Sequence, residues 1–223
     1  MTPVIALSGI TKSYGFAETT VHALRGVDLV VDRGDYLAIM GASGSGKSTL
    51  MNIIGALDGA TTGHYELDGI NIDSLDESAL SIVRNRKIGF IFQSFNLIPV
   101  LTAAQNVELP LLLTHLSGSE RKKRVATALR IVGLEDRMEH YPRQMSGGQE
   151  QRVAIARAIV NDPKIIVADE PTGDLDRKSA DDVLNLMDKL NRELGKTIFM
   201  VTHDPAAAER AKIQRKLDKG ALL

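Results

Sequence analysis

The sequence predicts an α/β fold built on a mostly parallel sheet, and two patterns support this prediction. Short apolar runs typical of buried strands occur at 36–40, 88–92, 164–168 and 197–202. Helix-like segments separate them, and the longest, at 177–194, carries one apolar stripe. Strands that alternate with helices pair in parallel, because each helix returns the chain to the same end of the sheet. The stripe consists of Val183, Leu184, Met187, Leu190 and Leu194.

Two regions outside this alternation predict additional lobes. Residues 4–35 have the short strands and turns of an N-terminal antiparallel β lobe, in which Val27, Leu29 and Val31 occupy every second position. Residues 94–160 have a helical composition instead, and they predict an inserted α-helical lobe. The expected helices of this lobe lie at 102–115, 118–132 and 135–140.

Length and composition limit the classes of protein and partner. A length of 223 residues suits a single domain, 1–223, whose core consists of 1–93 and 161–223. The net charge of −1 and the pI of about 6.5 provide no basic surface for nucleic acid, so we expect no nucleic-acid partner. No apolar run approaches the ~20 residues of a membrane span, so we expect no direct membrane insertion. The lack of cysteine excludes disulfides and thiolate metal ligands.

The pattern of a phosphate-binding loop lies between the strand at 36–40 and a helix-like segment that starts at Thr49. It reads Gly41-Ala42-Ser43-Gly44-Ser45-Gly46-Lys47-Ser48. The glycines let backbone N–H groups turn toward an anion, and the helix N-terminus adds partial positive charge. Lys47 can reach the β- and γ-phosphates of a nucleotide, and the Ser48 hydroxyl can bind Mg²⁺. The alternative is a flexible Gly/Ser turn beside a solvated lysine, which the flanking strand and helix disfavour.

Two acidic side chains follow the apolar run at 164–168. Carboxylates in this position are costly to bury unless a metal ion or hydrogen bonds stabilise them. Asp169 fits the Mg²⁺ side of a phosphoryl-transfer site, and Glu170 fits the base that orients an attacking water. A structural turn before Pro171 is the alternative, and the preceding phosphate loop argues against it.

Three further side chains are candidates for the same site. Gln93 follows the strand at 88–92 and His203 follows the strand at 197–202, and ligands of parallel sheets bind at such strand ends. Tyr14 precedes a polar loop, and its ring can stack on an adenine. Gln93 and Tyr14 also have ordinary interpretations, as a surface residue after a strand and as a half-buried strand residue.

A second helix end that can bind an anion lies at Ser146-Gly147-Gly148-Gln149. Ser146 is a favourable N-cap, and the two glycines leave the first helical N–H groups approachable. A single chain rarely needs two such helix ends for one nucleotide.

These motifs together resemble the ATP-binding cassette (ABC) ATPase family over essentially the whole chain. In chain order, the resemblance rests on the phosphate loop at 41–48, Gln93, Met145-Ser146-Gly147-Gly148-Gln149, 165–170, Gly173-Asp174-Leu175-Asp176 and His203. The Ser-Gly-Gly-Gln signature is highly specific to this family, whereas a phosphate loop alone indicates only an NTPase. Met145 stands where the family usually has leucine, which is an apolar exchange of similar volume.

The resemblance implies ATP and Mg²⁺ as cofactors and a P-loop NTPase core. It makes Tyr14 an adenine-stacking residue, Gln93 a contact of Mg²⁺ and water, and His203 a contact of the γ-phosphate. It also explains the second helix end, because in this family the signature of one subunit caps the ATP held by the other. We therefore expect an ATP-dependent homodimer.

The complete set of expected site residues follows from these roles. The expected catalytic residues are Glu170, His203 and Gln93, and the expected metal ligands are Ser48, Gln93 and Asp169. The expected nucleotide-binding residues are Tyr14, Gly41, Ser43, Gly44, Ser45, Gly46, Lys47, Ser48, Thr49, Gln93, Ser146, Gly147, Gly148, Gln149 and Asp174.

Within the family, the segments 89–99, 106–111 and 168–176 resemble the lipoprotein-releasing and macrolide-export subgroup. ATPases of this subgroup drive extrusion from beneath membrane subunits. The resemblance therefore implies transmembrane permease subunits as partners, and a cytoplasmic location at the inner face of the cell membrane. The loop at 94–99 is predicted to line a groove that receives a short helix of the permease.

Three other functions remain as alternatives. A DNA-repair or chromosome ATPase would carry long coiled coils or zinc modules between its nucleotide motifs, and the chain has neither. A translation-type factor would show two cassettes and a charged linker. An inactive regulatory module is disfavoured because both Glu170 and His203 are present. The sequence does not identify the cargo.

Overall fold

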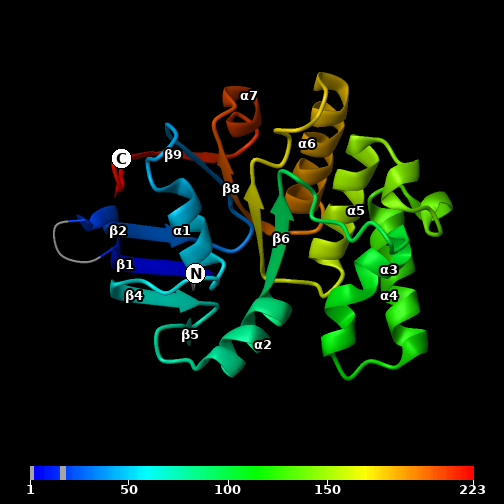
Figure 1. The fold of residues 1–223 in the computed structure, drawn as a ribbon, viewed down its shortest axis with the longest axis horizontal. Coiled ribbons are helices and arrows are strands. Elements are labelled where there is room, and N and C mark those ends of the chain that lie inside the picture. Colours follow the sequence, from blue (N-terminus) through cyan, green and yellow to red (C-terminus); the bar gives the residue numbers. More distant parts are fainter. Residues whose placement is uncertain (1–2, 16–18) are drawn as a thin grey trace.

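The computed structural model describes residues 3–15 and 19–223, and its elements form two sheets with helices around the larger one (Figure 1). The strands are β1 (Ile5–Tyr14), β2 (Val21–Val31), β3 (Tyr36–Met40), β4 (Thr62–Leu67), β5 (Ile70–Asn71), β6 (Ile88–Phe92), β7 (Ile165–Asp169), β8 (Thr197–Thr202), β9 (Ile213–Asp218) and β10 (Ala221–Leu222). The α-helices are α1 (Lys47–Ile54), α2 (Glu77–Lys87), α3 (Ala103–Glu108), α4 (Gly118–Ile131), α5 (Gly147–Ile159), α6 (Arg177–Arg192) and α7 (Pro205–Ala208). Short 3-10 helices are η2 (Leu109–Leu113), η3 (Glu135–Arg137) and η4 (Pro142–Gln144).

The six-stranded sheet has the order β10-β9-β3-β8-β7-β6, and every pair in it is parallel except β9 with β10. This confirms the predicted α/β fold. Because the register places Phe92 beside Asp169 and Asp169 beside Val201, the carboxyl ends of β6, β7 and β8 meet at one edge. Met40, the last residue of β3, pairs with Thr202 at the same edge. The polar residues that follow these strands are thereby brought together.

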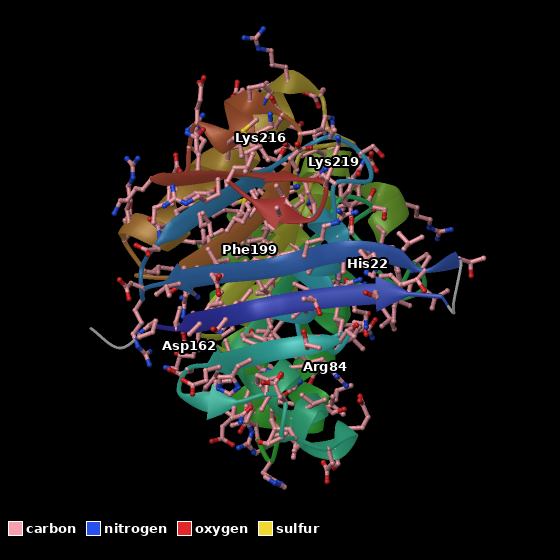
Figure 2. All side chains as sticks on the ribbon, turned by 90° about the vertical axis from the view of Figure 1, so that its left-hand side faces the viewer. His22, Arg84, Asp162, Phe199, Lys216 and Lys219 are labelled. Carbon is pink, nitrogen blue, oxygen red and sulfur yellow. The ribbon has the colours of Figure 1, made fainter. Side chains whose placement is uncertain are left out.

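The remaining strands form a four-stranded antiparallel sheet with the order β2-β1-β4-β5, as expected for the N-terminal lobe. Helix α1 packs between this sheet and the six-stranded sheet, where they share one buried apolar cluster. Phe199 and Val201 of β8 face this cluster, whereas Ile198 and Met200 face a second cluster formed with helices α3 to α7. Figure 2 looks onto the antiparallel sheet, with Phe199 behind it. Both faces of the central strands β3, β7 and β8 are buried, so these strands are largely apolar, whereas β9 exposes Gln214, Arg215 and Lys216.

The helical lobe is present, but two of its predicted helices are shorter than expected. The helix predicted at 102–115 is α-helical only to Glu108 and continues as the 3-10 helix η2. Pro110 explains the change, because proline has no N–H for an α-helical hydrogen bond. The segment predicted at 135–140 is helical only over η3. Leu194 lies beyond the end of α6 and is 45% exposed, so it does not belong to the buried stripe.

Part of the polar loop that follows Tyr14 lies outside the described residues. Over residues 3–15 and 19–223, the protein has no helix that is both long and apolar enough to cross a membrane.

Candidate functional site

The phosphate loop connects the carboxyl end of β3 to the N-terminus of α1, as the sequence predicts. Gly46 has φ 105°, a conformation that favours glycine, and no side chain caps α1. A Cβ atom on Gly46 would lie 2.5 Å from the carbonyl oxygen of Ala23, so this position has no room for a side chain. The loop therefore leaves the first N–H groups of α1 free for an anion.

Lys47 lies folded back over the loop that it belongs to. Its Nζ atom donates hydrogen bonds to the carbonyl oxygens of Gly41 at 2.8 Å and Ala42 at 3.0 Å. The ammonium group is thus held above the anion site by backbone acceptors. A phosphate oxygen in the site would meet a charged donor, and such hydrogen bonds are about twice as strong as neutral ones.

A pocket of about 650 Å³ extends from this loop along the carboxyl ends of the parallel strands. It brings together most of the residues that the sequence predicts for the site. These are Ser43, Gly44, Gly46, Lys47, Ser48, Thr49, Gln93, Asp169, Glu170 and His203. The other lining residues, which sequence reasoning missed, are Val21, His22, Ala23, Arg25 and Lys219.

The Glu170 carboxylate is fixed in the pocket by β8 and the residue that follows it. It accepts hydrogen bonds from the Thr202 hydroxyl at 3.0 Å, from the His203 N–H at 3.2 Å and from His203 Nδ1 at 2.8 Å. The backbone of Glu170 has φ 46°, a left-handed conformation that is costly for a residue with a side chain. The bond to Nδ1 leaves Nε2 as the ring nitrogen of His203 available to a ligand.

Asp169 is the last residue of β7 and lies at the same strand edge. Burial raises the pKa of its carboxyl group, and the neighbouring charge of Glu170 raises it further, against a smaller lowering effect of Lys47. A carboxylate in such surroundings is stabilised when a cation binds beside it. This agrees with the predicted role of Asp169 as a metal ligand.

The polar side chains of the pocket fit Mg²⁺. Ser48, Gln93 and Asp169 offer a hydroxyl, an amide carbonyl and a carboxylate, which are the hard oxygen ligands that this ion prefers. Among the described residues no cluster of three or more His, Cys, Asp or Glu side chains has the arrangement of a metal site. The set Ser48, Gln93 and Asp169 has one carboxylate, which suits an ion that nucleotide phosphates also bind.

Gln93 connects the end of β6 to the segment after Glu170. Its Nε2 atom donates a hydrogen bond to Asp174 Oδ1 at 2.6 Å. A Cβ atom on Gly173 would lie 2.9 Å from the Gln93 amide, so this glycine makes room for the glutamine. Asp174 therefore contacts the predicted site through Gln93 and does not line the pocket itself.

The signature residues lie apart from this pocket. Ser146 caps α5, and its hydroxyl accepts a hydrogen bond from the N–H of Gln149 at 3.3 Å. Ser146, Gly147, Gly148 and Gln149 are not among the residues that line the pocket around Lys47. In Figure 1, α5 lies on the other side of β6 from α1. A single chain therefore does not bring the two predicted anion sites together.

Tyr14 lies at the end of β1, beside the pocket and outside its lining. Its hydroxyl donates a hydrogen bond to Asp58 Oδ2 at 3.0 Å, and the Nζ atom of Lys12 lies 5.1 Å from the centre of the ring. Across the strand pair it faces Val21, which does line the pocket. Stacking of Tyr14 on adenine stays a prediction.

Comparisons with known proteins agree with this site. A family model described as "ABC transporter" matches residues 24–173. An uncharacterized ABC transporter ATP-binding protein of Bacillus subtilis, YvrO, is 53% identical over 93% of the chain and 90% of its own length. A macrolide export ATP-binding/permease protein of Hyphomonas neptunium is 47% identical over 99% of the chain, which spans only 34% of that relative.

A solved structure gives the same result. The ATP-binding cassette MJ0796, in a dimeric post-hydrolysis state bound to ADP and Pi, has 47% identity and a TM-score of 0.88, with 98% of this chain and 96% of that chain covered. The resemblance to ABC ATPases and the predicted fold are confirmed, and the macrolide-export relatives agree with the predicted subgroup. The chain belongs to the ABC transporter family, as an ATP-hydrolysing cassette of that family.

Proposed function

We propose that two copies of this chain close around two ATP molecules, and that ATP hydrolysis drives a transmembrane permease that exports its cargo. In this proposal the chain is one cassette, in which 94–160 forms the helical lobe and the rest forms the core. The observation that carries it is the separation of Ser146–Gln149 from the pocket around Lys47. A helix end built to bind an anion, yet remote from its own phosphate loop, is suited to the ATP of a second copy.

The residues of the pocket take defined roles in this reaction. The backbone of the phosphate loop and Lys47 bind the β- and γ-phosphates, and Glu170 orients the attacking water and accepts its proton. Thr202 and His203 hold the Glu170 carboxylate in place, while His203 Nε2 contacts the γ-phosphate. Ser48, Gln93 and Asp169 would hold Mg²⁺, which neutralises charge on the phosphates when it is bound.

One experiment tests both Glu170 as the catalytic base and the ATP-bound dimer. Glu170→Gln keeps the size and hydrogen bonding of the side chain but removes the proton acceptor, so turnover should fall by ~10²-fold or more. Because ATP binding persists, this variant should elute as an ATP-bound dimer in size-exclusion chromatography with Mg²⁺, whereas the parent stays mostly monomeric. Adding Ser146→Arg should abolish the dimer, since bulk then occupies the approach of the second ATP. A Glu170→Gln protein that stays monomeric, or that hydrolyses ATP at the parent rate, would contradict the proposal.

A groove of about 580 Å³ on the helical side supports the permease as partner. Its lining is largely apolar and includes Phe90, Phe92, Leu109 and Leu113, of which Leu113 is 79% exposed. An exposed apolar groove of this kind suits the apolar face of a short helix. A position at the inner face of the membrane and the direction of export follow from the same proposal, supported by the relatives named as macrolide export ATP-binding/permease proteins.

The residues of this groove differ from those that the sequence predicts. Of the loop 94–99, only Asn96 lines the groove. The ring of Phe95 turns toward the signature instead, since a Cβ atom on Gly147 would lie 3.7 Å from its Cζ atom. Phe95 and Asn96 both have positive φ values, 58° and 50°, which redirect the loop.

A pair of substitutions tests the groove. Leu113→Glu places a charge at its edge and should abolish co-purification with the membrane protein that accompanies the parent, identified by mass spectrometry. Val30→Glu is the matched control, because Val30 is 63% exposed on β2 and lies outside the groove. Both variants should keep ATPase activity in isolation. Equal recovery of the membrane protein by both would place the docking surface elsewhere.

A further inference from the structure

The turn between β9 and β10 has an unusual residue for its backbone conformation. Asp218 pairs with Ala221, so the connecting loop consists of Lys219 and Gly220 only. Both have positive φ values, 46° for Lys219 and 84° for Gly220. A two-residue hairpin loop with two positive φ angles favours Asn-Gly or Asp-Gly, because asparagine and aspartate tolerate the left-handed conformation. Lysine is therefore held there against its conformational preference.

The turn is clamped between the phosphate loop and β2. The Gly220 N–H donates a hydrogen bond to the carbonyl oxygen of Ser45 at 2.9 Å, and the Arg25 N–H donates one to the carbonyl oxygen of Gly220 at 2.8 Å. A Cβ atom on Gly220 would lie 2.7 Å from the Ala23 carbonyl oxygen, so the two backbones are in close contact. Lys219 cannot leave the left-handed conformation without disturbing these contacts. A residue kept under such strain indicates a function.

The side chain of Lys219 lines the pocket that contains the phosphate loop. It is exposed and makes no hydrogen bond or ion pair with any other residue in the described part of the chain. His22 and Arg25 of β2 line the same wall, and Figure 2 shows Lys219 and His22 toward the same end of the molecule. The acidic residues of the pocket, Asp169 and Glu170, lie at the carboxyl end of β7 instead. This wall of the pocket is therefore basic.

The order of groups along the pocket assigns a ligand to this wall. In the proposed function, Glu170 and Gln93 lie at the end where the γ-phosphate reacts, and Lys47 binds the β- and γ-phosphates. The wall of β2 and the hairpin turn is left for the α-phosphate and the nucleoside. We propose that Lys219 binds the α-phosphate of the nucleotide and so sets affinity for it, an inference that rests on the proposed role of this pocket. The acceptor is an anionic phosphoryl oxygen, which suits an ammonium donor.

The experiment uses three single substitutions in the full chain. Lys219→Asn removes the charge and supplies a residue that the turn favours, whereas Lys219→Arg keeps the charge. Lys212→Asn is the matched control, because Lys212 is exposed and lines none of the pockets described above. Isothermal titration calorimetry with MgADP and with the ATP analogue AMP-PNP gives the dissociation constants, thermal unfolding gives the melting temperature, and steady-state kinetics give KM and kcat.

We expect Lys219→Asn to raise the dissociation constants for MgADP and AMP-PNP about tenfold, which is the effect of losing one charged hydrogen bond. Its KM for ATP should rise while kcat stays, and its melting temperature should rise by about 1–3 °C as strain is relieved. Lys219→Arg should bind within about threefold of the parent, and Lys212→Asn should match the parent. A purely structural lysine cannot produce higher stability together with weaker binding.

Several results would overturn the inference. Nucleotide affinities of Lys219→Asn within twofold of the parent would show that no phosphate contact is made. Weaker AMP-PNP binding with unchanged MgADP binding would move the contact from the α-phosphate to the γ-phosphate. A melting temperature below that of the parent would show that the lysine is not strained. If the parent protein binds neither nucleotide, the proposed role of the pocket is contradicted. This result is distinct from the results that overturn only the role of Lys219.

Discussion

The N-termini of α1 and α5 are both suited to an anion, yet they are constructed differently. Helix α1 begins after Gly46, which has φ 105° and provides no side-chain cap. Helix α5 begins after Ser146, whose hydroxyl accepts from the Gln149 N–H while the Gln149 side chain accepts from the Ser146 N–H at 2.9 Å. The first helix leaves its N–H groups to a ligand, and the second satisfies part of its own.

In the proposed dimer, this difference would make the N-terminus of α1 a permanent phosphate site and that of α5 a conditional one. The N-terminus of α1 lies inside a pocket of about 650 Å³, together with Lys47 and the acidic residues. The N-terminus of α5 is capped within its own chain, so in the proposed dimer its contact with a phosphate would form and break as the two chains close and open. Helix α5 is also bonded to segments beside the pocket of its own chain. Gln151 Nε2 donates hydrogen bonds to the carbonyl oxygens of Phe92 at 3.1 Å and Pro171 at 2.6 Å. A displacement of α5 therefore acts on the segments beside Gln93 and Glu170.

The largest effect should come from the charged group at the first helix end. Lys47→Ala removes the ammonium donor from the β- and γ-phosphates, and ATP turnover should fall by ~10²-fold or more, since charged hydrogen bonds contribute ~1.5–3 kcal/mol each. Circular dichroism should show an unchanged fold, because among the described residues Lys47 bonds only to the carbonyl oxygens of Gly41 and Ala42 in its own loop. A Lys47→Ala protein with the parent ATPase rate would refute the phosphate-loop assignment.

The same exchange of glycine at the two helix ends should have different results. Gly46→Ala forces a left-handed alanine within 2.5 Å of the Ala23 carbonyl oxygen and should lower stability by about 3 kcal/mol, or about 6–12 °C in melting temperature. Gly147→Ala places its Cβ atom 3.4 Å from Leu175, an ordinary contact, so stability should not fall. In the Glu170→Gln background, however, Gly147→Ala should weaken the ATP-bound dimer. Equal melting temperatures for the two variants would contradict the comparison.

The sequence predicts which residues meet around the phosphate loop, because this information is local. A phosphate loop and the polar residues after parallel strands meet at one edge whatever the packing around them, and Gln93, Asp169, Glu170 and His203 do so. The wall formed by β2 and Lys219 depends on how the antiparallel sheet packs against the phosphate loop, which is a long-range contact without a motif. Its turn also lacks the Asn-Gly or Asp-Gly signal of such hairpins.

The same distinction applies to the loop 94–99 of the helical lobe. Phe95 is directed toward Gly147 by a loop whose carbonyl oxygens accept hydrogen bonds from Arg157, at 2.8 Å for Phe95 and 2.6 Å for Asn96. Arg157 lies on α5, more than sixty residues away in the chain, so hydrophobicity near 94–99 did not indicate which way the ring faces. The early end of α3 was visible in the sequence, since Pro110 forbids an α-helical hydrogen bond.

A smaller effect is expected at the nucleoside end of the permanent site. If Tyr14 stacks on adenine, Tyr14→Ala should weaken ATP binding about tenfold, whereas Tyr14→Phe and Tyr14→Trp should keep most of it, because only the face of the ring is used. The hydrogen bond lost in Tyr14→Phe goes to Asp58, which also pairs with Lys12 at 2.7 Å. Calorimetry with AMP-PNP measures the three affinities. Equal affinities for the three variants would show that Tyr14 does not stack on adenine and is an ordinary strand residue.

The smallest effect concerns the cap of the conditional site. Ser146→Ala removes an N-cap hydroxyl and should cost about 1 kcal/mol, or ~2–4 °C in melting temperature. Ser117→Ala is the matched control, because Ser117 and Glu120 form the same capping box at the start of α4. The two variants should lose similar stability, but in the Glu170→Gln background only Ser146→Ala should weaken the ATP-bound dimer in size-exclusion chromatography. If both dimers persist equally, the Ser146 hydroxyl serves only as a cap, and the N–H groups of Gly147 and Gly148 are left as the phosphate contact of the signature.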